Sequence, residues 1–179
     1  MKKRFLAIAV CAAFGSVMAH ADVINGGFET GNLAGWTVSG NPDYTGVGTQ
    51  PQSGNYAAYL GAVGSLDFLS QTLSTTAGTN YDLSYWLASD GGTPNEFSVS
   101  WGGTTLSDLM NIAAQSYTRY TYNVMATGSS TVLTFGSRDD PGYLHLDTIS
   151  VTPAIPEPAT LALFGIGLAG LGAIHRRKK

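Results

Sequence analysis

Apolar and polar residues alternate with a period of two over much of this chain, and this pattern constrains the fold more than any other feature. The clearest runs cover residues 79–88, 96–101 and 117–126. A strand directs successive side chains to opposite faces, so each run predicts a strand with one buried face. Turn signals such as Asp90-Gly91-Gly92 and Gly102-Gly103 separate the runs.

Similar segments predict further strands at 36–39, 54–61, 66–75, 130–136 and 143–152. About eight or nine strands at a spacing of about 10–14 residues are typical of an all-β, antiparallel two-sheet sandwich. We expect a short helical turn between Leu106 and Ala114. The side chains expected inside the sandwich are Leu83, Tyr85, Phe97, Val99, Tyr122, Phe135 and Leu146.

The N-terminus has the three parts of a secretory signal peptide. Lys2-Lys3-Arg4 is basic, Phe5 to Ala13 is apolar, and Ala19-His20-Ala21 matches the small-x-small cleavage pattern of signal peptidase. The alternative is a first transmembrane helix, but the apolar run is too short for a span. We therefore predict a signal peptide at 1–21 and a β-sandwich domain at 22–153.

The C-terminus combines three unlike features in a fixed order. Pro156-Glu157-Pro158 comes first, Leu161 to Ile174 carries no charge, and Arg176-Arg177-Lys178-Lys179 ends the chain. The uncharged stretch predicts a C-terminal transmembrane helix, slightly short for a span, whose basic tail stays in the cytoplasm. This segment, 154–179, is expected to be separate from the sandwich.

Charge is distributed unevenly along the chain. Seven of its nine Lys and Arg lie at the ends, so residues 22–155 keep only Arg119 and Arg138 against 11 acidic residues, a net charge of −9. A body without lysine cannot neutralise a phosphate backbone, which excludes nucleic acid as a partner. The single cysteine, Cys11, lies in the leader. The body therefore has no thiol nucleophile, disulfide or cysteine-ligated metal.

The C-terminal segment closely resembles the PEP-CTERM sorting signal of Gram-negative bacteria. The resemblance implies that a membrane-embedded exosortase recognises Pro156-Glu157-Pro158 and releases or transfers the body. It also implies an intermediate held in the inner membrane, followed by the cell surface or an extracellular matrix that contains exopolysaccharide. The alternative is a plain single-span anchor, which has the same topology.

A second resemblance covers most of the body. The opening Val23-Ile24-Asn25-Gly26-Gly27-Phe28-Glu29 and the ending Leu146-Asp147-Thr148-Ile149-Ser150-Val151 are similar to galactose-binding-like jelly rolls, a fold shared by carbohydrate-binding modules. This implies a jelly-roll sandwich and a structural calcium held by Glu29 and Asp147. The oxygen ligands suit calcium. The alternative is that both acids accept hydrogen bonds from turn amides.

Polar residues around Trp86 suggest a sugar platform. Trp86 shares a strand face with Asp82 and Ser84, and Arg119 and Asn123 share a face of the run at 117–126. A ring that stacks on a sugar, with polar groups beside it, suits a glycan. The predicted glycan-binding residues are therefore Trp86, Arg119 and Asn123. Alternatively, Trp86 packs under a loop or at the sandwich edge, while Trp36 and Trp101 are expected in the core.

The sequence gives little support for a catalytic function. There is no Gly-x-Ser-x-Gly motif. His145 alternates with leucines and is expected to face outward, and Asp139-Asp140 lies in a Pro-Gly turn. We therefore expect an exported, non-catalytic surface or matrix protein associated with exopolysaccharide. The alternatives are a specific lectin-like module and, less favoured, a glycoside hydrolase with two converging carboxylates.

Overall fold

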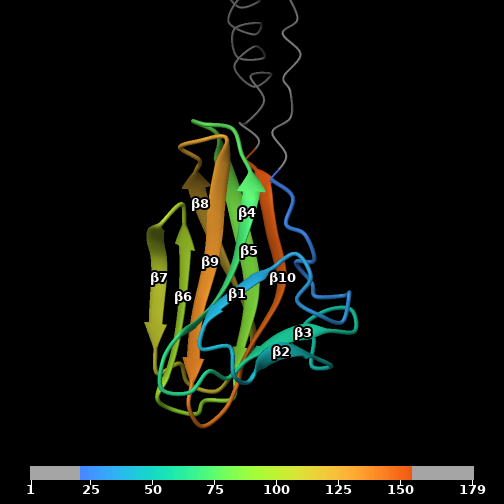
Figure 1. Ribbon diagram of the computed structural model, residues 1–179, viewed down its shortest axis with the longest axis vertical. Helices are drawn as coiled ribbons and strands as arrows, with labels where there is room; N and C mark the ends of the chain where they lie inside the picture. Colours follow the sequence, from blue (N-terminus) through green and yellow to red (C-terminus); the bar gives the residue numbers. More distant parts are fainter. Residues whose placement is uncertain (1–20, 155–179) are drawn as a thin grey trace, which may run out of the picture.

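The computed structural model describes residues 21–154, which form ten strands and no helix (Figure 1). The all-β prediction is confirmed. No helix in this described part is long and apolar enough to cross a membrane. The predictions for Ala19, for Pro156-Glu157-Pro158 and for the C-terminal helix lie outside the described residues. Ala21 is described, and its side chain is buried in the core.

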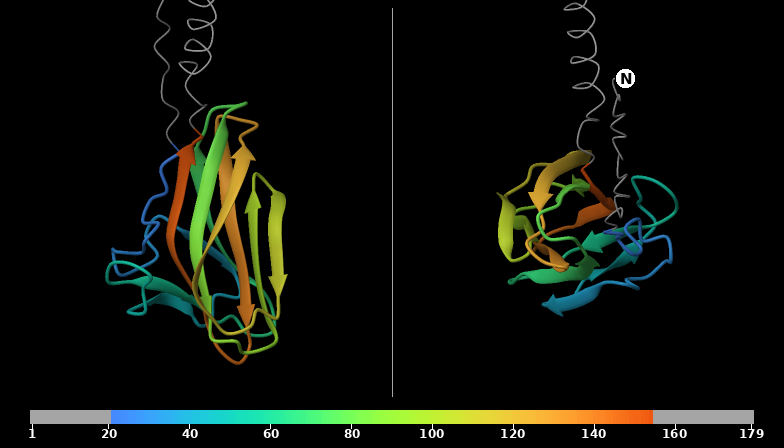
Figure 2. Two further views of the ribbon diagram at one scale, coloured as in Figure 1. Left: turned by 180° about the vertical axis from the view of Figure 1, so that it is seen from behind. Right: turned by 90° about the horizontal axis from the view of Figure 1, so that it is seen from above.

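Two five-stranded antiparallel sheets pack face to face (Figure 2). We call them the front sheet, with strand order β1-β4-β9-β6-β7, and the back sheet, with order β2-β3-β10-β5-β8. The strands are β1 Thr37–Gly40, β2 Thr45–Gly48, β3 Ala57–Leu60, β4 Asp67–Ser74, β5 Asn80–Ser89, β6 Asn95–Trp101, β7 Thr104–Met110, β8 Gln115–Met125, β9 Ser130–Asp139 and β10 Leu144–Pro153.

Two predictions about strands need correction. The helical turn expected within 106–114 is wrong, because most of that segment is β7, which pairs with β6. Gly102 and Gly103 both have positive φ (56° and 83°), as a two-residue hairpin turn requires, and this turn returns the chain onto β6. Strand β2, with the sequence Thr-Gly-Val-Gly, was not predicted, since its glycines hide any alternation.

Aromatic rings from both sheets meet at the centre of the sandwich. The ring of Tyr85 on β5 lies 5.6 Å from Phe97 and 5.3 Å from Phe135 on the front sheet, and 5.3 Å from Tyr120 on β8. Six of the seven predicted core residues are buried, and Tyr122 is half-buried against the same core. Trp36 and Trp101 are buried as expected, at 8% and 5% exposure.

A buried carboxylate joins the two sheets at one edge. Asp67 on β4 is fully buried and accepts hydrogen bonds from Thr45 of β2 and Ser137 of β9. Burial raises the pKa of Asp67, and the two hydroxyl donors partly offset that shift. The bond from Thr45 ties the short strand β2, which pairs with β3 at the edge of the back sheet, to the front sheet.

The last strand runs the length of the molecule. Its final residue and the first described residue lie at the same end of the sandwich, whereas β10 begins at the opposite end, just after Tyr143 (Figures 1 and 2). On β10, His145 and Asp147 point to the outer face of the back sheet, opposite to the buried Leu144 and Leu146.

Candidate functional site

Three tyrosines and a histidine line an open cleft on the outer face of the back sheet. The cleft holds about 370 Å³ and lies where β2, β3 and β10 are neighbours. We call it the tyrosine cleft. The residues that line it are Tyr44, Gly48, Thr49, Gln50, Tyr59, Tyr143 and His145. Tyr44 and Tyr143 are exposed, at 63% and 38%, so their rings are accessible to a ligand.

Glycines make the floor on which these rings lie. A Cβ atom at Gly46 would lie 2.5 Å from the hydroxyl of Tyr59, and one at Gly61 would lie 2.6 Å from the ring of Tyr143. Such approaches exclude any side chain at either position. The two rings meet edge to face, with centroids 5.6 Å apart. This geometry holds both rings in fixed positions, with one ring edge against the other ring face.

The tyrosine cleft is uncharged at neutral pH. None of its seven lining residues is acidic or carries a lysine or arginine side chain. Burial lowers the pKa of His145, and the negative charge of Asp90 only partly offsets that effect. The imidazole is therefore neutral at pH 7 and offers one donor and one acceptor. The cleft combines aromatic rings with neutral hydrogen-bonding groups, which suits a neutral polar ligand with apolar C–H faces.

A loop borders the cleft and crosses the back sheet. The hydroxyl of Tyr117 on β8 donates to the carbonyl oxygen of Gln50 at 2.6 Å. On the other side, Asp147 of β10 accepts from the amides of Gln52 and Ser53 at 2.8 and 3.1 Å. Strand β5 lies between β10 and β8, so the segment 50–53 passes over β5.

Glu29 holds the end of the same loop. Its carboxylate accepts from the amides of Asn55 at 3.0 Å and Tyr56 at 3.1 Å. These two backbone donors, that of Asn55 first, lower the pKa of Glu29. Because the folded pKa of Glu29 is lower than its unfolded pKa, its hydrogen bonds stabilise the fold above the unfolded pKa. That stabilisation is lost as pH falls through the folded pKa.

The predicted calcium pair thus lies together beside one loop. A Cβ atom at Gly27 would lie 3.8 Å from both the Oδ1 atom of Asp147 and the Cγ atom of Glu29. Burial raises the pKa of Asp147, and the charge of Glu29 adds to that shift. Both carboxylates accept hydrogen bonds from backbone N–H groups, as expected if they act as turn acceptors rather than as calcium ligands. Among the described residues no group of three or more His, Cys, Asp or Glu side chains is placed to hold a metal.

A bulge in β10 creates this arrangement. The pairing of β10 with β5 shifts between Asp147 and Ser150, and Thr148 has a positive φ of 49°. The amide of Ile149 then donates to the carbonyl of Gly26 at 2.9 Å. A side chain at Gly26 would overlap the carbonyl oxygen of Ile149, so the first turn approaches the bulge only because residue 26 is glycine.

The predicted glycan residues separate into two groups. Arg119 and Asn123 line a shallow hollow of about 380 Å³ on the outer face of β5, β8 and β10, whereas Trp86 does not line it. The guanidinium of Arg119 donates to the Ser84 hydroxyl at 3.3 Å, and the Asn123 amide donates to Asp82 at 2.8 Å. Trp86 is half-buried between Asp147 and Arg119, on the strand that the loop 50–53 crosses.

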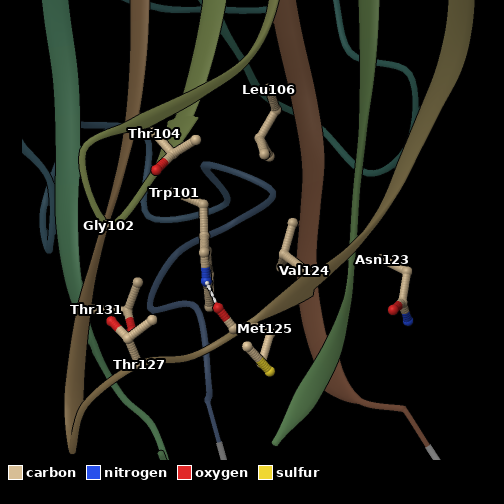
Figure 3. A pocket seen from close by; sticks show the side chains of 9 residues that line it. All are labelled: Trp101, Gly102, Thr104, Leu106, Asn123, Val124, Met125, Thr127 and Thr131. Carbon is tan, nitrogen blue, oxygen red and sulfur yellow. Dashed lines mark hydrogen bonds between the residues drawn. The ribbon is translucent and has the colours of Figure 1, made fainter. Parts of the chain in front are cut away.

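A third hollow, of about 280 Å³, opens where β6 and β7 meet the end of β8 (Figure 3). The indole N–H of Trp101 donates to the carbonyl of Met125 at 3.0 Å, and Leu106 and Val124 lie on one side of the ring in this view (Figure 3). Its lining is uncharged, and the indole donor is already used. This hollow is a gap between sheet edges, and the buried Trp101 forms part of its wall.

Sequence patterns did not reveal the tyrosine cleft. Its aromatic residues come from three separate places: Tyr44 lies in a turn, Tyr59 lies on β3, and Tyr143 and His145 lie at the start of β10. His145 was predicted to face outward, and it does so, but as part of the cleft wall. The one available signal was the excess of tyrosine beside glycine at Tyr59-Leu60-Gly61 and Gly142-Tyr143.

Comparison with known families agrees with this architecture. Residues 21–136 match the model described as a carbohydrate binding domain. The chain belongs to this carbohydrate-binding family. Residues 154–178 match the PEP-CTERM protein-sorting motif, so this family member is an exported protein that an exosortase handles. No curated protein matches the chain.

Solved structures of carbohydrate-binding modules share the fold. TmCBM61, solved in complex with β-1,4-galactotriose, has a TM-score of 0.61 and 20% identity, over 75% of this chain and all of that one. The CBM22-1 xylan-binding domain of Paenibacillus barcinonensis Xyn10C has a TM-score of 0.56 and 18% identity, over 79% of this chain and all of that one. Modules of this kind are non-catalytic. A bacteriophage CBA120 tailspike domain is also similar, with a TM-score of 0.59 and 14% identity, over 75% of this chain and 21% of that one.

The loop held by Glu29 and Asp147 makes a testable prediction. Gly54 and Gly64 both have positive φ (75° and 79°), but a Cβ atom at Gly54 would overlap the Glu29 carboxylate, whereas one at Gly64 meets nothing within 4 Å. We expect Gly64→Ala to lower the free energy of unfolding by about 1 kcal/mol, the cost of backbone strain. Gly54→Ala should cost at least about 1 kcal/mol more, since the carboxylate must also move.

Urea unfolding of both variants measures this difference, and the rate of proteolysis within 50–56 locates it. Equal losses of stability would contradict the view that Glu29 positions the loop.

Proposed function

We propose that this protein binds a neutral glycan in the tyrosine cleft and acts, without catalysis, in the exopolysaccharide layer outside a Gram-negative cell. The observation that carries the proposal is the pair of rings of Tyr59 and Tyr143, accessible beside the neutral His145 and the backbone of β2. Rings stack on the C–H faces of sugars, and neutral donors and acceptors satisfy the hydroxyls.

Charge supports a neutral ligand. The body carries a net charge of −9, and its two arginines lie away from the cleft lining. An anionic polysaccharide would be repelled at long range and would meet no cation in the cleft. The known ligands in the titles of similar structures, galactotriose and xylan, are also neutral.

The hollow beside Arg119 and Asn123 is the second candidate for the glycan. It offers hydroxyl, amide and guanidinium groups, as the predicted lectin-like site requires. Its lining has no exposed aromatic ring, because Tyr122 packs against the core and Trp86 lies outside it. Without stacking, hydrogen bonds alone must compete with water for the sugar. The tyrosine cleft is therefore the better site.

The placement of the acidic residues gives little support for a hydrolase. Both oxygens of Asp140 accept hydrogen bonds from Arg138, and Asp139 is fully buried. Neither carboxylate lines one of the three hollows described above.

Affinity for neutral oligosaccharides tests the glycan site. With galacto-, xylo- and cello-oligosaccharides as probes, we expect Tyr143→Ala to weaken the best binding about two- to tenfold, since stacking on one ring is worth about 0.5–1.5 kcal/mol. Tyr143→Phe should retain most of it. The matched control is Arg119→Ala, which changes the other hollow and should leave affinity unchanged.

Titration calorimetry gives the constants, and thermal melting checks that each variant folds. Loss of affinity in Arg119→Ala alone would move the site to the second hollow. Absence of binding to every neutral probe would contradict the proposal.

The sorting signal supports a proposal about location. We infer that the chain passes through an intermediate held in the inner membrane, with Arg176 to Lys179 in the cytoplasm, before release near Pro156-Glu157-Pro158. Replacing the three motif residues by alanine should retain the protein in the inner-membrane fraction. Mass spectrometry of the secreted form should show a chain from Asp22 to about residue 156–160. A secreted form that still carries Arg176 to Lys179 would contradict this processing.

Calcium binding by Glu29 and Asp147 is also a proposal. The donor set fits the ion chemically, because two carboxylates lie beside the side-chain oxygens of Gln52, Ser53 and Thr148, which contact one another at 3.0–3.1 Å. If an ion binds only the folded state, it adds about 2.7 kcal/mol at a hundredfold excess over Kd. When bound, calcium would neutralise two carboxylates that otherwise repel each other.

Native mass spectrometry and melting with and without chelator test this site. We expect Asp147→Asn to remove one bound calcium per chain and its share of the calcium-dependent rise in Tm. Glu29→Gln should weaken the same site. Unchanged calcium content in both variants would leave the two acids as acceptors for the loop amides alone.

A further inference from the structure

Residues of β10 meet three different features of the outer face in order along the strand. His145 lines the tyrosine cleft, and Asp147 accepts hydrogen bonds from amides of the loop 50–53. Farther along the strand, Ser150 and Thr152 line the shallow hollow shared with β5 and β8. The loop therefore lies between the two hollows and separates them along the direction of β10.

The same loop also crosses the sheet from β10 to β8. The carbonyl oxygen of Gln50, a residue of the cleft lining, accepts a hydrogen bond at 2.6 Å from the hydroxyl of Tyr117 on β8. Burial first, and then the charge of Asp147, raise the pKa of Tyr117, so the phenol keeps its proton and remains the donor. Gln50 and Tyr117 thus close the side of the cleft that faces β5.

This loop is held as a fixed wall. Besides the amide bonds to the buried Asp147, the hydroxyl of Thr148 lies 3.0 Å from the Ser53 hydroxyl and donates to the Gln52 side chain at 3.1 Å. Glu29 accepts hydrogen bonds from the amides of the residues that follow the loop. Opening the loop therefore requires breaking hydrogen bonds to three separate parts of the fold: the segment around Glu29, β8 and β10.

The tyrosine cleft remains open toward β2. This strand is at the edge of the back sheet, and the exposed Tyr44 lies directly before it. The cleft volume of about 370 Å³ is at the low end of the range of about 300–1,000 Å³ that is typical of ligand pockets. The cleft therefore has room for a short segment of ligand, which enters from the β2 side and meets the loop at the other.

We propose that the tyrosine cleft binds the end of a neutral glycan chain and not its interior. This inference rests on the proposed function and specifies the ligand. A chain that is bound by its interior must leave the site on two sides, but the loop 50–53 blocks both routes farther across the back sheet. A chain that is bound by its end needs only the opening toward β2.

His145 supplies a group that recognises a chain end. A terminal sugar carries a free hydroxyl at the position where an internal sugar carries its next glycosidic bond. The neutral imidazole has one donor and one acceptor, and within residues 21–154 no hydrogen bond to protein uses either. A site built to hydrogen-bond a hydroxyl discriminates strongly against a ligand that lacks it. His145 therefore favours the terminal sugar.

Titration calorimetry of the full-length chain tests the proposal with unbranched glycans of increasing length, made of the neutral sugar that binds best. We expect one bound protein per glycan chain, whatever its length, and an affinity per chain that does not change with length. Recognition of the interior instead offers a new site with each added sugar. A number of bound proteins that rises in proportion to chain length would overturn the proposal.

Chemical reduction of the ligand identifies the end that is bound. Borohydride opens the terminal ring at the reducing end and leaves every other sugar intact. With chains longer than the cleft, loss of most of the affinity after reduction assigns the cleft to the reducing end. Unchanged affinity, together with one protein per chain, assigns it to the opposite end.

A shortened loop provides the variant. Replacing residues 50–53 by two glycines removes the wall, so one long glycan should then bind several proteins. The matched control is Arg119→Ala, which changes the second hollow and should keep one protein per chain. A shortened variant that folds, as thermal melting checks, and still binds one per chain would contradict the role of the loop. If it does not fold, the length series on the native chain decides alone.

The length series also separates this inference from the proposed function. Absence of binding to every neutral glycan contradicts the function itself. Binding whose stoichiometry rises with length leaves the neutral-glycan site in place and overturns only the recognition of chain ends.

Discussion

Contact between the aromatic rings of the two sheets is the interaction on which the rest of this structure depends. Tyr85 stacks on Tyr120 within the back sheet and meets Phe135 of the front sheet edge to face. Burial raises the pKa of Tyr85 far above its usual value, so the phenol stays protonated and pairs with the Tyr122 hydroxyl at 3.3 Å. With this centre fixed, the outer face of the back sheet is free to carry polar and aromatic groups.

Glycine has a second role in this molecule, which is to let functional groups approach the backbone. Gly46 and Gly61 receive the rings of the tyrosine cleft, and Gly26 lets the first turn reach the bulge of β10. Gly54 leaves room for the carboxylate of Glu29. In each case a methyl group would occupy space that a side chain or carbonyl already uses. At these four positions, glycine is what allows the close approach.

The alternation of apolar residues predicted the long strands and most of the core, because burial of one face acts on every second residue. It failed at β2 and β7, where glycine or a hairpin turn decides the conformation. The candidate site was harder. Arg119 and Asn123 were placed correctly on one outer face, but the tyrosine cleft joins residues from separate parts of the chain, and no local pattern records that proximity. The amides of Gln52 and Ser53, which donate hydrogen bonds to Asp147, are about 95 positions away from it in sequence.

The direction of β10 has a consequence for how the molecule is displayed. The strand has ten residues and rises about 3.3 Å per residue, so roughly 30 Å separate Tyr143 from Pro153. The C-terminal segment leaves from the far end of that strand, so any surface that holds the tail faces the end of the sandwich remote from the cleft (Figure 1). The tyrosine cleft, near the start of β10, would then face away from that surface.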